Sequence, residues 1–398
     1  MKSEHLLPVA FTTALLGAPL LGHAAADASA WRFGLEAGIG YDSNAYLAPG
    51  VSYIDHAATG SPLVDPATHS GSFIPLELKA AYVDNDHRKL RWVGAYDFDA
   101  SLYPGSATEN ANRYDHELKV GTEYTIAKRG RREDVVQVTP FLRSHDKTYF
   151  NRDTGDAMVS AAGTDLSERY SYTATGIEAR YESETSRLPY SLELLLTDLN
   201  YEEPTSAAFD SYDHTYFRVG GDLNLPVSKR SKVILSLDHF TRDYDEWRAR
   251  DLSGTKVAGT ARKYTYNKLG ASVRGAIGRQ WVVYLDYAML DREDNHLGYH
   301  DYTQDGYGLR VIYKPDRRLR VRGKLAWWDR DYDHAFAFDD PTQPGMTYDS
   351  QQLKLRADYA LAKPYGIWAE VETRDVDSTD TRYDYERTQL MVGWRWET

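Results

Sequence analysis

The sequence predicts one large antiparallel β-barrel that spans a bacterial outer membrane. Apolar and polar residues alternate in segments of about ten residues, which is the pattern of barrel strands. The connections between these segments alternate between short and long, and no apolar run after residue 22 is long enough for a membrane helix. Barrel strands place their apolar residues at every second position, so a hydrophilic average composition does not exclude a membrane protein.

The composition supports β-structure and excludes several classes of function. Tyr accounts for 31 of the 398 residues and Met for only 5, and such an aromatic excess favours strands and half-hydrated surfaces. The 59 acidic side chains outnumber the 47 basic ones, and the net charge of −12 argues against nucleic acid as a partner. Because the chain has no Cys, disulfides, thiol nucleophiles, thiolate zinc sites and iron–sulfur clusters are excluded.

The amino terminus has the pattern of a secretory signal. Lys2 is followed by an apolar stretch from Leu6 to Gly22, and Ala24 and Ala26 satisfy the small-residue rule for cleavage before Asp27. The alternative is a short buried helix. No Cys follows the apolar stretch, so the pattern is not that of a lipoprotein. We expect residues 1–26 to be a signal peptide and residues 27–398 to form the barrel.

Strict alternation predicts the strands one by one. The clearest segment runs from Arg318 to Trp327, where four cations at even positions alternate with apolar residues and one Gly. A helix would spread these charges around its circumference, whereas a strand places them on one face. The same pattern predicts about sixteen strands, the even number that bacterial barrels require. Their expected starts are near residues 31, 72, 89, 112, 134, 168, 189, 211, 232, 262, 280, 299, 318, 346, 366 and 382.

The connections between the strands fall into two classes of length. Short connections are expected at residues 84–88, 128–134, 184–189, 226–231, 277–279, 314–317 and 362–365. Longer ones, mostly rich in Gly, Pro, Ser and Asp, are expected notably at residues 48–71, 150–167, 247–261 and 334–345. Short periplasmic turns and long extracellular loops are typical of outer-membrane barrels, whereas a soluble β-sandwich has polar outward faces.

Aromatic residues recur at the expected strand ends. We expect them to form two girdles at the headgroup levels of the membrane. The outer girdle would contain Tyr114, Tyr170, Tyr172, Tyr212, Tyr216, Tyr264, Tyr266, Tyr302, Tyr348, Tyr383 and Tyr385. The periplasmic girdle would contain Trp31, Trp92, Tyr190, Trp281, Tyr365, Trp394 and Trp396.

The last expected strand resembles the carboxy-terminal assembly signal of outer-membrane barrels. Leu390, Val392, Trp394 and Trp396 alternate with polar or small residues, and the strand closes on an aromatic. The barrel assembly machinery is therefore an expected partner. The chain departs from the signal by two further residues, Glu397 and Thr398, which leaves the terminal contact open.

The alternate strand positions are expected to line a charged lumen. Such charges require water or partners, because burying them unpaired would cost several kcal/mol each. A cationic wall facing acidic walls would create a transverse field across a water-filled pore, while a plugged barrel with paired charges is the alternative. The expected cationic wall consists of Arg310, Arg318, Arg320, Arg322, Lys324, Lys354 and Arg356. The expected inward acids are Glu36, Asp42, Glu77, Asp97, Asp99, Glu117, Glu123, Glu178, Glu182, Glu193, Asp222, Asp238, Glu370 and Glu372.

Two further sets of side chains are candidate sites. Tyr103, Tyr284, Trp328 and Trp368 are expected to point inward, either as stacking surfaces for sugar rings or as packing for loops folded inward. An Arg-acid-x-acid motif recurs at the outer ends of the strands. Its acids would form a ring that binds divalent cations or steers cationic solutes, or else pair with neighbouring cations or bridge lipopolysaccharide. These acids include Asp243, Asp245, Asp331, Asp333, Asp375 and Asp377.

Catalytic constellations are poor in this sequence. Ser144, His145 and Asp146 have the residue types of a triad, but neighbours in a strand point to opposite faces. His214 and Asp243 are candidate cross-strand neighbours without an evident nucleophile beside them. The chain has no glycine-rich phosphate loop and no histidine-rich metal motif. We expect no enzymatic activity, no cofactor and no bound metal.

The segment from Gly38 to Tyr46, with its core Gly-Tyr-Asp-Ser-Asn, resembles the start of a family of bacterial outer-membrane β-barrel porins. The resemblance implies a porin-like barrel, often associated with exopolysaccharide or capsule operons. Surface-lipoprotein assembly modifiers open their barrels with similar stretches. They and poly-glucosamine-type exporters carry a helical repeat domain before the barrel, whereas only the expected signal precedes the first strand here. No functional residues are carried over.

Two functions remain open at this stage. The first is a channel for small hydrophilic solutes or for export of an extracellular polysaccharide. The second is a non-conducting structural or surface-interaction barrel of the adhesin type, whose Tyr- and Asp-rich loops make the contacts. Expected partners are outer-membrane lipid and lipopolysaccharide, the barrel assembly machinery and polysaccharide export components.

Overall fold

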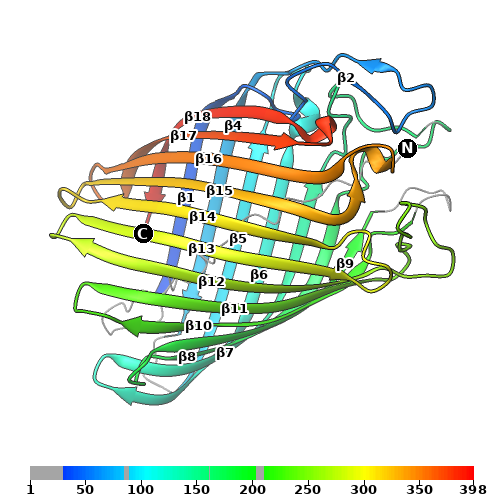
Figure 1. Cartoon of the computed structure of the whole chain (residues 1–398). Coiled ribbons are helices and arrows are strands. Elements are labelled where there is room, and N and C mark those ends of the chain that lie inside the picture. The colour runs from blue at the N-terminus through cyan, green and yellow to red at the C-terminus, as the bar shows by residue number, and fades with distance from the viewer. Residues whose placement is uncertain (1–29, 85–88, 161, 203–209) are drawn as a thin grey trace.

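The structure, a computed structural model, describes residues 30–84, 89–160, 162–202 and 210–398. Within them, sixteen strands form one closed antiparallel barrel, and β1 closes the ring by pairing with β18 (Figure 1). The predicted signal peptide, residues 1–26, lies outside the described residues. The barrel strands are β1 (Ala30–Asp42), β4 (Gly71–Val83), β5 (Leu90–Leu102), β6 (Arg113–Arg129), β7 (Arg132–Lys147), β8 (Tyr172–Ser183), β9 (Tyr190–Tyr201), β10 (His214–Pro226), β11 (Ser231–Tyr244), β12 (Lys263–Ile277), β13 (Trp281–Asp294), β14 (Tyr302–Tyr313), β15 (Leu319–Phe336), β16 (Gly345–Ala360), β17 (Tyr365–Ser378) and β18 (Tyr385–Glu397).

The predicted fold class is confirmed, and the strand positions follow the alternation closely. The largest offset is at β8, which was expected near residue 168 and begins at Tyr172. Each strand pairs with the next strand along the chain, and the ring closes on itself. A closed barrel has no unpaired edge, so every strand can form its backbone hydrogen bonds inside the membrane.

The two ends of the barrel differ in their connections (Figure 1). Long loops gather at one end and include the short hairpin of β2 (Tyr53–Ile54) and β3 (Leu63–Val64). Three single 3-10 turns also lie in these loops, namely η2 (Glu109–Ala111), η3 (Ala337–Asp339) and η4 (Thr381–Tyr383). We call this the outer end and the opposite end, with its short turns, the periplasmic end. No helix among the described residues is long and apolar enough to cross a membrane.

The outward face of the barrel is apolar. Leu285, Leu355 and Val392 lie in the middle of their strands and are 58%, 45% and 53% exposed. Most of the aromatics expected at the periplasmic girdle, including Trp31, Trp281 and Tyr365, are likewise exposed. A closed barrel with an exposed apolar band is stable only with lipid around it, and the chain is accordingly an outer-membrane barrel.

The barrel closes at a seam between β1 and β18. Gly38 pairs with Gly393, and the indole of Trp368 from β17 packs on the inner side of both glycines. The terminal residues extend this pairing, because the Thr398 backbone N–H donates to the Phe33 carbonyl at 3.0 Å and the Phe33 N–H donates to Thr398 Oγ1 at 2.9 Å. Glu397 and Thr398, which depart from the assembly-signal pattern, therefore belong to the seam.

Candidate functional site

The lumen is lined by charged side chains that remain partly accessible. Asp99 and Arg113 form an ion pair at 2.6 Å, yet their side chains are 51% and 45% exposed. Lys79 and Arg322 also point inward and are 48% and 40% exposed. A tightly filled interior would bury these groups, so solvent reaches the inner face of the barrel at these positions.

The predicted acids face this interior, and most of them lie beside a cation. Four acids form one row across β1, β4, β5 and β6, because Glu36 pairs in register with Glu77, Glu77 with Asp99, and Asp99 with Asp115. Sequence reasoning missed Asp115, which lies on the same strand face as Glu117. Ion pairs join Glu77 to Lys79, Glu117 and Glu178 to Lys119, Glu123 to Arg91, Glu182 to Arg180, Glu193 and Asp238 to Arg218, and Glu370 and Glu372 to Lys354. Asp97 and Asp222 also point inward.

Asp42 is the most deeply buried of these acids. Its side chain is inaccessible to solvent and accepts hydrogen bonds from Arg387, from the Tyr103 hydroxyl at 2.7 Å and from the Gln389 amide at 3.0 Å. This carboxylate belongs to the Gly-Tyr-Asp-Ser-Asn segment, so that segment forms a buried contact at the outer end of the seam.

The predicted cationic wall lies on β14, β15 and β16. Their inward positions carry a single carboxylate, Asp358, and the side chains of Arg322 and Arg356 stand directly opposite each other in register. Lys324 and Lys354 form a second pair of opposed like charges. Arg318 is a correction, because it lies in the periplasmic turn before β15 and not on the wall.

Neighbouring acids neutralise much of this wall, which corrects the idea of fully separated cationic and acidic walls. Arg310 contacts both Asp286 oxygens at 2.7 Å, and Arg356 contacts Glu36 at 2.7 Å. Asp358 lies among three guanidiniums, at 3.0 Å from Arg322, 3.0 Å from Arg356 and 3.2 Å from Arg395. Cross-strand register brings these groups together, and single-strand alternation does not reveal it. In the described residues, Arg320 has no carboxylate within ion-pair distance and is exposed.

The candidate stacking residues divide into two pairs. Tyr103 and Trp368 are 4% and 6% exposed, with Tyr103 stacked on Phe73 and Trp368 covered by Arg356. Both are packing residues, which corrects their assignment as free stacking surfaces. Tyr284 and Trp328 are half-buried, and arginine side chains approach their rings, with Arg310 at 4.5 Å from Tyr284 and Arg330 at 5.1 Å from Trp328.

The strand geometry shows which face of the barrel each residue of the Arg-acid-x-acid motif takes. On β15, Arg330 and Tyr332 are buried on the inner side, while Asp331 and Asp333 are exposed on the outer side. The predicted ring of acids therefore does not line the channel entrance, because the two acids, two residues apart, share one face, while the Arg before them and the residue between them take the opposite face. The same outward placement holds for Asp243, Asp375 and Asp377, and Asp245 is exposed directly after the end of β11.

Sequence reasoning missed three members of this outward acidic surface, namely Asp305, Asp329 and Asp349. Asp305, Asp329, Asp349 and Asp377 are consecutive register partners on β14, β15, β16 and β17. The Tyr287 hydroxyl donates to Asp305 at 2.6 Å. Within the described part of the chain, no group of three or more His, Cys, Asp or Glu side chains is arranged to hold a metal ion.

The inward arginines and the strand-opening tyrosines form a buried collar inside the outer end. Arg292 lies 4.3 Å from the ring of Tyr264 and 4.2 Å from that of Tyr302, and Arg330 lies 4.3 Å from Tyr302. Tyr264, Tyr302 and Tyr348 are at most 5% exposed. These tyrosines, with Tyr266, Tyr383 and Tyr385, were expected in the outer membrane girdle, and that prediction is wrong. The exposed rings of Tyr287, Tyr307 and Trp327 occupy the outward face instead.

Long loops cross the outer end above the collar. The Tyr53 hydroxyl in the β1–β4 loop donates to Asp153 in the β7–β8 loop at 3.0 Å. Arg152 Nη1 donates to the Arg382 carbonyl in the β17–β18 loop at 3.1 Å, and the other terminal nitrogen donates to the Leu47 carbonyl. Burial raises the pKa of Asp153, as expected for a carboxyl enclosed by loops. These contacts join three loops to one another at the outer end.

The residues weighed as a triad are separated by the strand. His145 points inward and contacts Asp115 at 2.5 Å, while Ser144 and Asp146 take the opposite parity on β7. His214 is buried and contacts the Tyr212 carbonyl, whereas Asp243 faces outward.

Comparisons with known proteins concern the barrel fold. No protein-family model and no curated protein matches the chain. The similar solved structures include the outer-membrane-expressed OmpT of Vibrio cholerae, at 11% identity and a TM-score of 0.46 over 94% of this chain and 99% of that one. An anion-selective porin from Comamonas acidovorans has 12% identity and a TM-score of 0.46 over 93% and 100% of the two chains. A bacterial polysaccharide outer membrane secretin has 10% identity and a TM-score of 0.45 over 91% and 97%.

One sequence-based prediction is corrected by these comparisons. The chain was expected not to be an enzyme, but structures at 10–12% identity, OmpT and porins among them, show the fold alone and leave enzymatic activity unresolved. Because one fold hosts many activities, the exclusion does not hold.

Proposed function

We propose that this barrel is an outer-membrane channel for small hydrophilic solutes. The observation that carries the proposal is the solvent exposure of inward-facing charges, such as the 51% and 45% of the paired Asp99 and Arg113. Ionised side chains hold this exposure only where water fills the space beside them. Sixteen strands enclose more space than side chains can fill, so a continuous aqueous path is the natural consequence.

The charge distribution favours anions along part of this path. The inward positions of β14, β15 and β16 carry seven cations, namely Arg310, Arg320, Arg322, Lys324, Arg330, Lys354 and Arg356, against the single carboxylate Asp358. Asp286, Glu370 and Glu372 approach from the adjacent strands and Glu36 from β1 across the seam, whereas Arg320 stays exposed without such a partner. A fixed positive charge beside water raises the local concentration of anions.

Export of an extracellular polysaccharide is the more specific form of this proposal. It is supported by the resemblance of the Gly38 to Tyr46 segment and by the half-buried rings of Tyr284 and Trp328 beside arginines. Rings and guanidiniums together suit the apolar and hydroxyl-bearing faces of sugars. Lipopolysaccharide, the barrel assembly machinery and polysaccharide export components stay predicted partners.

The loop contacts favour a second candidate, a closed surface-interaction barrel. Asp153 and Arg152 tie the β7–β8 loop to loops on other sides of the outer end. If these contacts close the entrance completely, the loops present a binding surface and the lumen does not conduct.

A liposome-swelling assay with neutral sugars of increasing size separates the two candidates. The channel proposal predicts swelling whose rate falls with solute size. Arg152→Ala should increase the rate, because it removes the hydrogen bonds to the Leu47 and Arg382 carbonyls. Lys229→Ala, in an exposed periplasmic turn, is the matched control and should leave the rate unchanged. Folded protein that gives no swelling, in the wild type and in Arg152→Ala alike, would support the closed barrel.

A further inference from the structure

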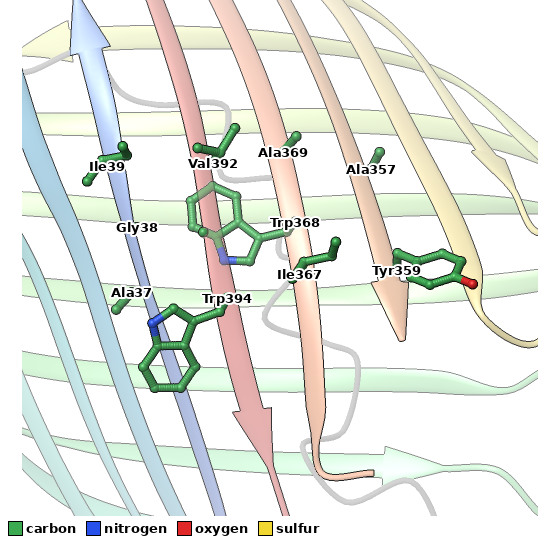
Figure 2. A pocket seen from close by; sticks show the side chains of 11 residues that line it. Ala37, Gly38, Ile39, Ala357, Tyr359, Ile367, Trp368, Ala369, Val392 and Trp394 are labelled. Atoms are coloured by element: carbon green, nitrogen blue, oxygen red, sulfur yellow. The ribbon is translucent and has the colours of Figure 1, made fainter. Parts of the chain in front are cut away.

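The outward face of the barrel carries an apolar groove beside the seam (Figure 2). The groove has a volume of about 710 Å³ and crosses β16, β17, β18 and β1. Figure 2 shows the Trp394 ring on one side of the groove, the Tyr359 ring on the other side and Ile367 between them, with the small side chains of Ala357 and Ala369 in a separate row on β16 and β17. Every outward side chain that lines it is apolar or aromatic.

The groove follows from residue size in paired positions. Ala357 and Ala369 are direct register partners, so two neighbouring strands carry only methyl groups at this point. In the row that contains Ile367, its register partners Tyr359 and Trp394 are large, so these side chains project further from the barrel than the two methyl groups do. Behind the groove, Gly38 and Gly393 leave bare backbone, and the indole of Trp368 closes the floor from inside.

The groove lies toward the periplasmic end of the apolar band. One residue pair, Ala360 and Gly366, separates the Tyr359–Ile367 pair from the turn that joins β16 to β17. The exposed rings of Tyr365 and Trp394 mark the interfacial level on the same side. A groove at this depth opens into the hydrocarbon of the periplasmic leaflet, where an apolar chain and not water is the available occupant.

The turns at this end supply positive charge at the headgroup level. Lys363 is exposed in the β16–β17 turn, and Arg317 and Arg318 are exposed in the adjacent β14–β15 turn. The outward face at the opposite end carries the acidic surface of Asp305, Asp329, Asp349 and Asp377 described above. Charge therefore distinguishes the two ends, and the periplasmic end is complementary to a phosphate-bearing headgroup.

We propose that the groove binds one phospholipid of the periplasmic leaflet. An acyl chain passes over Ile367, between Trp394 and Tyr359, and continues over Ala357 and Ala369, while the headgroup phosphate lies against Lys363. A second copy of the chain suits the groove less well, because a two-fold contact would oppose two concave surfaces and leave both unfilled. A flexible acyl chain adapts to the depression without that cost.

The experiment measures lipid retention by native mass spectrometry after release from nanodiscs of phosphatidylethanolamine and phosphatidylglycerol at a ratio of about 3:1, close to a mixed-charge leaflet. We expect wild type to retain phospholipid and Ala369→Trp, which fills the groove, to lose it. Ala179→Trp is the matched control, because Ala179 faces outward four residues from the periplasmic end of β8, as Ala369 lies four residues from that of β17. Ala369→Leu is a milder filling variant, and heat-modifiable migration on gels identifies the folded protein.

Lys363→Gln tests the headgroup contact separately. It should reduce the preference for phosphatidylglycerol over phosphatidylethanolamine about fivefold, which corresponds to about 1 kcal/mol for one interfacial cation. Equal lipid retention in folded Ala369→Leu, Ala369→Trp and Ala179→Trp would overturn the proposal. A cross-linked oligomer that is lost only in the groove-filling variants would overturn it in favour of a second copy of the chain.

Discussion

Replacing Asp358 with Asn should reveal how strongly the lumen depends on paired charges. The Asp358 side chain is 1% exposed and contacts the guanidiniums of Arg322, Arg356 and Arg395 at 3.0, 3.0 and 3.2 Å. Asn keeps the shape of the residue and removes its charge. Arg356 would retain Glu36, whereas Arg322 and Arg395 would lose their nearest carboxylate.

The expected cost follows from the burial of these partners. Breaking a fully buried ion pair costs roughly 3–5 kcal/mol, because it leaves an uncompensated charge. The Arg322 and Arg395 side chains are 40% and 23% exposed, so lumen water screens part of that cost. Asp358→Asn should therefore lower the free energy of unfolding by about 2 kcal/mol.

Urea unfolding in phospholipid vesicles, followed by tryptophan fluorescence, measures this change. Asp375→Asn is the matched control, because Asp375 faces outward and should change stability by less than about 0.5 kcal/mol. The reasoning fails if the two substitutions cost the same, or if Asp358→Asn is neutral.

Three further predictions test other parts of the structure. Leu355→Arg on the lipid face should lower the free energy of unfolding by roughly 2–4 kcal/mol in the same assay. Gln352→Arg should lower it by under about 1 kcal/mol, because the new cation can pair with a lumen acid. Equal costs would mean that the faces are misassigned. Arg320→Gln should shift the reversal potential toward cation selectivity and Lys263→Gln, on the outer surface, should not. Burial raises the pKa of Asp153 above its ordinary value of 3.8, because it disfavours the charged carboxylate. The loop contact is therefore most stable below pH 3.8 and loses stability as the pH rises through the raised pKa. Hydrogen exchange at the Ala67 amide, corrected for intrinsic rate, should show this dependence, and Asp153→Asn should abolish it.

Alternation made the barrel predictable because each strand separates lipid from lumen at every second residue. The same rule is sufficient to place the motif acids. Asp243 has the parity of the exposed Leu235 and Leu237 on β11, so its outward position could have been deduced. Tyr266 has the parity of the inward Lys268 on β12, which likewise contradicts a place in the membrane girdle.

The ion-pair network and the buried aromatics could not be obtained in this way. Asp358 lies beside Arg395 only because β16, β17 and β18 pair in one register, and Glu36 meets Arg356 across the seam. Trp368 is buried because two glycines from distant parts of the sequence leave space beside it. Register and loop packing depend on the closed barrel as a whole, and no local pattern encodes them.

The central claim, an open aqueous lumen, is tested most directly by single-channel recording of wild-type protein in a planar bilayer under a salt gradient. The account predicts stepwise conductance with a reversal potential that favours anions, because the wall of β14, β15 and β16 carries excess positive charge. Folded protein that inserts but remains electrically silent would contradict the claim and identify the barrel as closed by its loops.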